Sequence, residues 1–405
     1  MVAVTLMGVA GTVEAYTTQQ VLGSSNYVRG GVSSSGNGHQ VAFITGSALV
    51  ASDTNSKEDA YVKDMKTGTV SLISARPDGT AGGGRTYSTV KLTGNGRFAL
   101  FNSEAADLAA ASGAPYRQNI YLRDLLTSTT YLIAAGINGS NVDHYPSGVS
   151  EDGRFVYYTS QLYGLGRHMF VLDRSLNVIS QVDVNSSNTL GNGIVIEGTD
   201  RTVSCDGRFV VFSSGSTNLV ANDSNGVNDV FLVDRMGGHS VVNLTQIGND
   251  SSNYPEITCD GNYVLFESRA SNIVEGDTNA TRDLFRYSLV TGSIERVSLQ
   301  SNGQEYLGAP TATELGYVEG GDISMDGRYI FYIEGTRAVS TYDSENFLVM
   351  RDIELNQSTV IAPAGSGYYA RYPVTSYDGR VVFYVSVTNI STLANPRLRM
   401  VTGHL

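Results

Sequence analysis

The chain has 405 residues but no tryptophan, only 8 prolines, 5 histidines and 2 cysteines. With so few prolines and 45 glycines, its turns are expected to be glycine turns. No stretch approaches the roughly 18 apolar residues of a membrane-spanning helix, so we expect no membrane span. No segment sustains a helical period of apolar residues either, which points to β-structure.

Positive charge is also scarce, since the formal net charge is −12 at pH 7 and the isoelectric point is near 4.9. An acidic surface repels a phosphate backbone, so no nucleic-acid partner is expected. The same surface suits metal cations, neutral sugars or basic protein surfaces.

Motifs of common catalytic sites are missing. The sequence contains no G-x-S-x-G, H-E-x-x-H, C-x-x-C, phosphate-binding loop or G-x-G-x-x-G. The histidines are scattered over different repeat positions, so they suggest no shared metal site. Acidic residues are plentiful, and a catalytic carboxylate pair assembled from distant segments therefore stays open as an alternative.

What the chain does contain is one nine-residue phrase in seven copies. A good copy is S-C-D-G-R-F-V-V-F at 204–212, and each copy places an Asp-Gly or Asn-Gly turn between two β-forming runs. Four strand signals per unit and a period of 52 to 66 residues are typical of a β-propeller. The turn glycines are Gly38, Gly96, Gly153, Gly207, Gly261, Gly327 and Gly379.

We therefore predict an all-β fold, a single seven-bladed β-propeller of four-stranded antiparallel blades over residues 16–405. The last unit supplies only three strand signals, and Thr12–Val21 reads as a spare strand ahead of the first unit. The ring is expected to close by placing this N-terminal strand in the C-terminal blade, which removes exposed sheet edges.

Residues 1–15 allow two interpretations. Val2–Ala10 is apolar, and V-E-A at 13–15 has the small-residue spacing of a secretory cleavage site, although the basic start of a signal peptide is absent. The segment is therefore either a signal-peptide remnant or an ordinary extra strand.

The repeat also resembles a known family. The phrases S-x-D-G-R-F-V-x-F and D-x-N-x-x-x-D-V-F-L-V-D, followed by a T-G turn, are similar to the TolB-type (WD40-like, PD40) propeller repeats of bacterial periplasmic and secreted proteins. The resemblance covers nearly all of 16–405 and implies a secreted, cell-surface or periplasmic location. It does not carry over TolB's binding of Pal, because TolB's N-terminal α/β domain is not matched.

In such blades the Asp-Gly turns share one face of the ring, and the longer polar loops share the other, where binding is expected. Three loops there repeat the pattern D-x-N-x-x-x-D. Oxygen ligands at positions 1, 3 and 7 suit Ca²⁺, whereas the alternative is an Asp-led turn whose side chains bond the backbone. The candidate ligands are Asp53, Asn55, Asp59, Asp223, Asn225, Asp229, Asp277, Asn279 and Asp283.

Tyrosines gather on the same face and could stack on sugar rings or anchor a protein partner. Alternatively, they seal the gaps between blades. An insertion at 300–321 adds two more tyrosines and is either a specificity element or a tolerated surface loop. The candidate ligand-binding residues are Tyr145, Tyr254, Tyr372, Tyr306 and Tyr317.

The two cysteines occupy the same repeat position in consecutive units, just before the Asp-Gly turn. They could form a disulfide. Equivalent atoms of neighbouring units are expected to lie beyond the limit of about 7 Å for such a bridge, so the sequence favours free thiols at Cys205 and Cys259.

Three functions follow from these observations. The first is an exported, non-catalytic binding or scaffold protein that recognises a protein or glycan ligand. The second is a carbohydrate-active lyase or hydrolase at the central funnel, and the third is a self-assembling subunit of an extracellular structure. Clustered carboxylates with shifted pKa values at the funnel would favour the enzyme.

Overall fold

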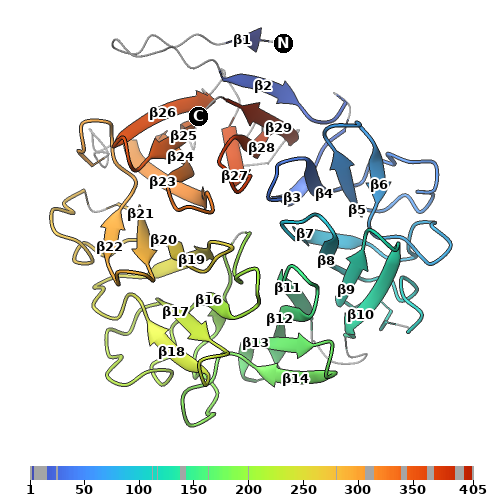
Figure 1. Cartoon of the computed structure of the whole chain (residues 1–405), viewed down its shortest axis with the longest axis horizontal. Coiled ribbons are helices and arrows are strands. Elements are labelled where there is room, and N and C mark those ends of the chain that lie inside the picture. Colours follow the sequence, from blue (N-terminus) through green and yellow to red (C-terminus); the bar gives the residue numbers. More distant parts are fainter. Residues whose placement is uncertain are drawn as a thin grey trace.

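The computed structural model describes residues 2–3, 16–23, 26–111, 113–115, 117–136, 143–162, 164–198, 200–279, 281–305, 314–338, 344–362, 369–387 and 396–403. Every regular element in these ranges is a strand, and the strands form seven antiparallel sheets arranged as a ring (Figure 1). No helix in the described ranges could cross a membrane. The prediction of a seven-bladed β-propeller is confirmed.

Blades 1 to 4 follow one another along the chain, each running from the ring centre outwards. Blade 1 contains β3 (Arg29–Ser34), β4 (Gln40–Thr45), β5 (Asp59–Asp64) and β6 (Val70–Leu72). Blade 2 contains β7 (Thr86–Leu92), β8 (Phe98–Ser103), β9 (Asn119–Asp124) and β10 (Thr129–Ala134). Blade 3 contains β11 (His144–Val149), β12 (Phe155–Leu162), β13 (Gly166–Asp173) and β14 (Val178–Gln181). Blade 4 contains β15 (Val195–Ile196), β16 (Phe209–Ser214), β17 (Asp229–Asp234) and β18 (Ser240–Asn243).

Blades 5 to 7 complete the ring. Blade 5 contains β19 (Ser252–Ile257), β20 (Tyr263–Ser268), β21 (Asp283–Ser288) and β22 (Ile294–Arg296). Blade 6 contains β23 (Glu314–Ile323), β24 (Tyr329–Ala338), β25 (Ser344–Asp352) and β26 (Gln357–Ala362). Blade 7 contains β27 (Tyr369–Thr375), β28 (Val381–Val387) and β29 (Arg397–Thr402).

The fourth strand of blade 7 comes from the other end of the chain. β2 (Thr17–Gln20) pairs with β29, and β1 (Val2–Ala3) pairs with the outer side of β2. The predicted closure by an N-terminal strand is therefore confirmed. Residues 4–15, which hold most of the possible signal segment, lie outside the described part of the chain.

The hydrophobic core lies between blades. Ile44 of blade 1 and Phe101 of blade 2 belong to one buried cluster, and comparable clusters join other neighbouring blades. Within several blades an aromatic pair from the second and third strands stacks with ring centroids 5.7 to 6.1 Å apart. Each blade thus covers the apolar face of the next one, as expected for a closed repeat.

The Asp-Gly turns are held in a repeated way. In the copy at 204–212, the Ser204 hydroxyl donates to Asp206 (2.6 Å), and Arg208 pairs with Asp234 at the end of the third strand (2.7 Å). The same arginine–aspartate pair recurs in three other blades, as Arg97–Asp124, Arg154–Asp173 and Arg328–Asp352. The turn phrase therefore has a structural role.

The turn glycine also makes the joint between blades. Gly207 has a φ of +71°, and a Cβ atom there would come within 2.7 Å of the Phe155 ring in the preceding blade. Gly153 packs in the same way beneath Phe98. The repeat therefore needs both the left-handed backbone and the missing side chain.

The residue before each turn lies close to the ring axis, and we call these seven residues the central belt. Backbone hydrogen bonds of 2.6 to 2.8 Å join five of the seven neighbouring pairs. The belt residues are Gly36, Gly94, Glu151, Cys205, Cys259, Met325 and Tyr377.

The belt corrects the expectation of free thiols. Cys205 and Cys259 form a disulfide, and their Cα atoms are 4.7 Å apart. The expectation was wrong because it assumed the separation that neighbouring blades have at an average radius. At the axis the blades converge, and the Cys205 N–H donates directly to the Cys259 carbonyl (2.8 Å).

Candidate functional site: the central channel and its mouth

At the end of the central channel that carries the Asp-Gly turns, one side chain crosses the ring axis. The Tyr377 ring of blade 7 extends over Gly36 and Gly94, where a Cβ atom would overlap it. Its hydroxyl lies 3.0 Å from Glu151 Oε1 of blade 3 and 3.1 Å from Cys205 Sγ of blade 4. One side chain therefore spans the axis, which requires glycine at two belt positions.

Above the Tyr377 side chain, the inner segment of blade 4, from β15 to Arg201, occupies the channel. We call this segment the plug. Its regular strand β15 has only two residues, and the described residues that follow contact blades on both sides of the ring. The Lys91 ammonium of blade 2 donates to the Asp200 carbonyl (2.8 Å), and the Asp200 N–H donates to Glu256 Oε1 of blade 5 (2.8 Å). Arg201 pairs with Asp322 and donates to the Ile323 carbonyl of blade 6.

These charged groups are buried, and Lys91, Asp200, Glu256 and Asp322 are each at most 6% exposed. Asp322 also accepts backbone N–H groups from Thr375 (2.6 Å) and Ile323 (2.7 Å). Burial raises the pKa of Asp322, and the nearby Arg201 opposes that shift. The network anchors the inner segment of blade 4 to blades 2, 5 and 6 through the Asp200 backbone and the Arg201 side chain.

Glu197 stands at the start of the same segment and is half-buried. The Ser147 hydroxyl donates to its Oε1 atom (2.6 Å). Burial raises the pKa of this carboxyl group, while Ser147 lowers it. Glu197 is therefore the one acidic group of the blade 4 segment that combines partial exposure with a raised pKa.

At the open end, three consecutive inner strands surround a pocket of about 520 Å³, a size within the range of about 300–1,000 Å³ for small-molecule sites. We call it the mouth pocket. It lies where β27, β3 and β7 begin, on the face opposite the Asp-Gly turns. Its polar and aromatic lining consists of Tyr27, Arg29, Glu58, Arg85, Thr86, Tyr87, Arg371 and Tyr372.

Each arginine of the mouth pocket lies beside a tyrosine ring. The guanidinium carbons are 5.4 to 5.8 Å from the ring centroids in the pairs Arg29–Tyr27, Arg85–Tyr87 and Arg371–Tyr372, which is within cation–π range. Burial, and then the hydrogen bond to Glu104, raise the pKa of Tyr87 to about 12. The Tyr87 ring therefore stays neutral at physiological pH.

Two of the three arginines share one acidic partner. Glu58 lies 3.1 Å from Arg29 Nε and 2.9 Å from Arg85 Nε. Arg371 is 3.6 Å from Glu319 of β23. The lining itself thus has three guanidinium groups and one carboxylate, while Glu319 and Glu104 contact Arg371 and Tyr87 from outside it.

The predicted ligand-binding tyrosines whose side chains the structure describes do not lie together. Tyr372 lines the mouth pocket and is 36% exposed. Tyr254 is 42% exposed but is not part of the pocket lining, and Tyr145 is half-buried with the Arg167 guanidinium 4.2 Å above its ring. Tyr254 and Tyr372 both have a φ of +52° at a β-bulge in their inner strands.

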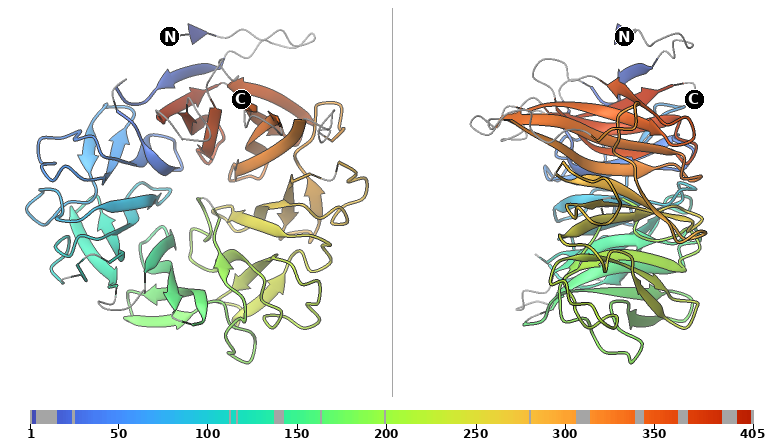
Figure 2. Two further views of the ribbon diagram at one scale, coloured as in Figure 1. Left: turned by 180° about the vertical axis from the view of Figure 1, so that it is seen from behind. Right: turned by 90° about the vertical axis from the view of Figure 1, so that its left-hand side faces the viewer.

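The 300–321 insertion is described only in part. Tyr306 lies outside the described residues, and Tyr317 is described only by its backbone in β23. β23 and β24 have 10 residues each, and blade 6, orange in the edge-on view of Figure 2, reaches beyond the rest of the ring on one side. The insertion therefore lengthens a hairpin on the pocket face.

The three Asp-Asn loops share one hydrogen-bond arrangement. In the first, Asn55 Nδ2 donates to Asp59 Oδ2 (2.7 Å), and Asn55 Oδ1 accepts from the Lys57 N–H (2.7 Å). Asp59 also accepts from the Ser74 hydroxyl (2.6 Å). The equivalent contacts occur as Asn225–Asp229–Thr245 and as Asn279–Asp283–Ser298.

The first residues of these loops have different partners. Asp53 accepts from the Tyr61 hydroxyl, and Asp223 accepts from Asn243 Nδ2 (3.2 Å). In the third loop, Arg296 Nη1 lies 3.1 Å from Asp277 and 3.6 Å from Asp283. A guanidinium group thus occupies the position among the carboxylates that a cation would take.

Sequence reasoning missed most of the channel. Lys91, Glu256 and Asp322 share one repeat position, three residues before the belt. A charged residue at that position of an inner strand was a usable signal. The arginines of the mouth pocket gave a weaker sequence signal, since each stands within two residues of a tyrosine near the start of an inner strand.

No family model matches the chain, and no curated protein matches it. Solved structures do. An oligogalacturonate lyase from Vibrio parahaemolyticus is 11% identical, with a TM-score of 0.61 over 99% of this chain and 97% of that one. An oligogalacturonate lyase in complex with manganese is 12% identical, with a TM-score of 0.59 over 99% and 96%.

A prolyl endopeptidase gives a TM-score of 0.53 at 12% identity, over 94% of this chain and 51% of that chain. TolB from Acinetobacter baumannii is a more distant neighbour, at 14% identity and a TM-score of 0.41 over 85% of this chain and 76% of that one. At these identities the likeness shows the propeller fold alone. Membership of the TolB-type repeat family stays a prediction.

Proposed function

We propose that this protein is an exported, non-catalytic binding protein that recognises an acidic glycan in the mouth pocket. The observation that carries the proposal is the lining itself, in which three tyrosine rings alternate with three arginines. Aromatic faces stack on sugar rings, and guanidinium forks bind carboxylates in two parallel hydrogen bonds.

The electrostatics favour an anionic ligand over a neutral one. The chain carries a net charge of −12, yet the mouth pocket collects three arginines around one carboxylate. Glu58 holds Arg29 and Arg85 in position before a ligand arrives, which reduces the ordering cost of binding. A ligand carboxylate would complete the coordination of these guanidinium groups.

Export is supported by two features. A disulfide persists in an oxidising compartment, and the apolar run Val2–Ala10 with V-E-A at 13–15 has part of the pattern of a secretory segment, without its basic start. Two solved structures of this fold are oligogalacturonate lyases, and the proposal for this chain rests on its own pocket residues.

The test compares binding of acidic and neutral oligosaccharides of equal length by calorimetry, after a glycan-array screen. Tyr372→Ala and Arg85→Ala are each expected to weaken binding at least about tenfold, since they remove an aromatic face and a guanidinium group that line the pocket. Tyr254→Ala is the matched control, because it has the same φ and a similar exposure but lies outside the pocket. Equal binding of neutral and acidic glycans, or equal loss in all three variants, would overturn the proposal.

A carbohydrate-active lyase or hydrolase is the second candidate, and Glu197 is the observation that favours it. Its carboxyl group has a raised pKa, as a general acid requires. Incubation with the bound oligosaccharide, followed by chromatography of the products, separates the two functions. Cleavage that Glu197→Gln abolishes would replace the binding proposal, and an unchanged ligand supports it.

A further inference from the structure

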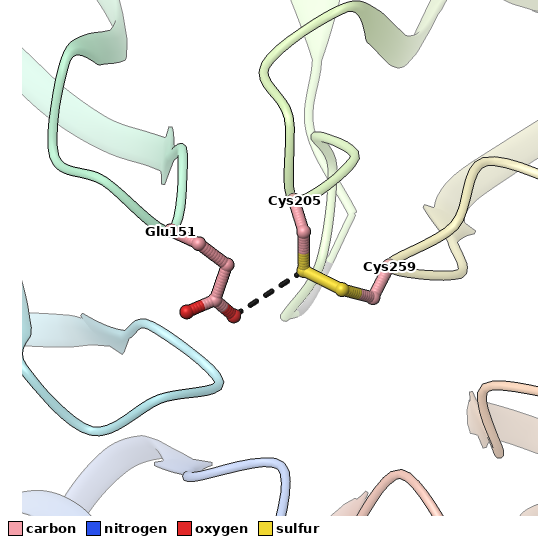
Figure 3. A group of neighbouring side chains, drawn as sticks. All are labelled: Glu151, Cys205 and Cys259. Carbon is pink, nitrogen blue, oxygen red and sulfur yellow. Dashed lines mark hydrogen bonds between the residues drawn. A yellow bond between two sulfur atoms is a disulfide. The ribbon is translucent and has the colours of Figure 1, made fainter.

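The belt disulfide is part of a larger group of donor atoms on the ring axis. Glu151, Cys205 and Cys259 place a carboxylate oxygen and two sulfur atoms within 4.8 Å of one another. Among the residues that the structure describes, no other three His, Cys, Asp or Glu side chains meet this closely. Figure 3 shows the three side chains pointing towards one another from three turns.

The backbone holds this group together independently of the disulfide. The Glu151 N–H donates to the Cys205 carbonyl (2.8 Å), and the Cys205 N–H donates to the Cys259 carbonyl (2.8 Å). Closure of the ring keeps the three turns at the axis. Reduction of the disulfide would therefore leave both thiols beside the carboxylate.

The carboxylate is oriented from two sides. The Asn95 N–H donates to Glu151 Oε2 (2.8 Å), and the Tyr377 hydroxyl donates to Oε1 (3.0 Å). Oε1 is 3.3 Å from Cys205 Sγ, which carries no proton while it is in a disulfide. In the oxidised form the contact between this oxygen and the sulfur therefore gains no hydrogen bond, whereas a thiol or a bound cation would satisfy both atoms.

We infer that the reduced protein binds one soft divalent cation, such as Zn²⁺, through Cys205, Cys259 and Glu151. Two electrons and two protons from a thiol or phosphine reductant convert the disulfide into two thiols. The metal then displaces both thiol protons, so its affinity falls as the pH falls. Thiolate ligands select Zn²⁺ or Cd²⁺ over Ca²⁺ and Mg²⁺, and water completes a tetrahedral site. Metal binding and disulfide formation therefore exclude each other at the channel floor.

The test uses the full chain, reduced with a phosphine, desalted without air and titrated with Zn²⁺ by calorimetry and by competition with a chromophoric chelator. The reduced protein is expected to bind one Zn²⁺ per chain and the oxidised protein none. Cys205→Ser and Cys259→Ser should each abolish binding. Tyr377→Phe should weaken it about 10- to 100-fold, because it removes the hydrogen bond that orients the ligand.

The exposed Glu275 provides the control variant, and Glu275→Gln should bind as the wild type does. Circular dichroism checks that each reduced protein keeps its β-structure. If a serine variant fails to fold, the comparison of reduced and oxidised wild type still decides the question. A folded, reduced wild type that binds no Zn²⁺, or a serine variant that binds as well as the wild type, would overturn the inference.

Discussion

The buried pair Arg201–Asp322 joins blade 4 to blade 6 through the channel, and its loss should destabilise the ring. Arg201 is 15% exposed and Asp322 is fully buried, so Arg201→Met leaves an uncompensated carboxylate in the interior. Removing one partner of such a pair costs about 3–5 kcal/mol. With an unfolding entropy of about 2.1 cal/mol/K per residue, a chain of this size should lose about 4–6 °C in Tm.

Calorimetric melting of the wild type and three variants tests this value. Arg208→Met is the matched control, because it breaks an arginine–aspartate pair whose arginine is 43% exposed, where solvent screens the charges and the fall in Tm should be much smaller. The double variant Arg201→Met with Asp322→Asn should recover part of the loss, since it removes the unpaired buried charge, although the single amide oxygen of asparagine replaces only one of the two carboxylate oxygens that accept backbone N–H groups. Burial holds the pKa of Asp322 above its ordinary value, so the defect of the single variant should shrink as the pH is lowered. Equal shifts for Arg201→Met and Arg208→Met would refute the idea that the plug holds the ring.

Three further predictions concern the repeat and its loops. Gly207→Ala should cost more stability than Gly226→Ala, because both glycines have a φ near +70° but only the first would meet Phe155; equal denaturation midpoints would contradict the proposed joint. Burial raises the pKa of Asp59 to about 6, so its favourable contribution is complete below about pH 4 and is lost as the pH rises through 6. Asp59→Asn should therefore gain up to ~3 kcal/mol relative to wild type between pH 4 and 7, and a constant difference would count against this shift. Because the loop carboxylates already accept hydrogen bonds, EGTA should leave the Tm unchanged at low micromolar protein, whereas a fall in Tm would demonstrate bound calcium.

The repeat made the architecture predictable from the sequence. The conformation of each Asp-Gly turn is determined locally, because glycine supplies the left-handed backbone and the flanking runs form strands whatever lies beyond them. The spare strand near the N-terminus and the missing strand near the C-terminus were found by counting the strand signals in each unit. The closure of the ring, the Arg–Asp pairs of the turns and the face on which the long loops lie follow from this regular repetition of turns and strands.

The site could be predicted only in part. The pocket face and Tyr372 followed from the position of the inner strands, but Tyr254 occupies the same repeat position and lies outside the pocket. Which of several equivalent tyrosines lines a pocket depends on the arginines of the neighbouring blades. That combination joins residues 27, 85 and 372, which are far apart in the chain.

The sequence alone determined the number of blades, the face of each loop and the way the ring closes, because these follow from local turn signals and from the number of strands counted along the chain. The tertiary structure decided the disulfide, the Tyr377 side chain that crosses the axis and the charged plug. Those features depend on the distances between blades at the axis, where seven inner strands converge: the disulfide joins neighbouring blades, whereas Tyr377 and the charged network reach across the ring. Such distances are set by closure of the whole ring, and no single repeat contains them.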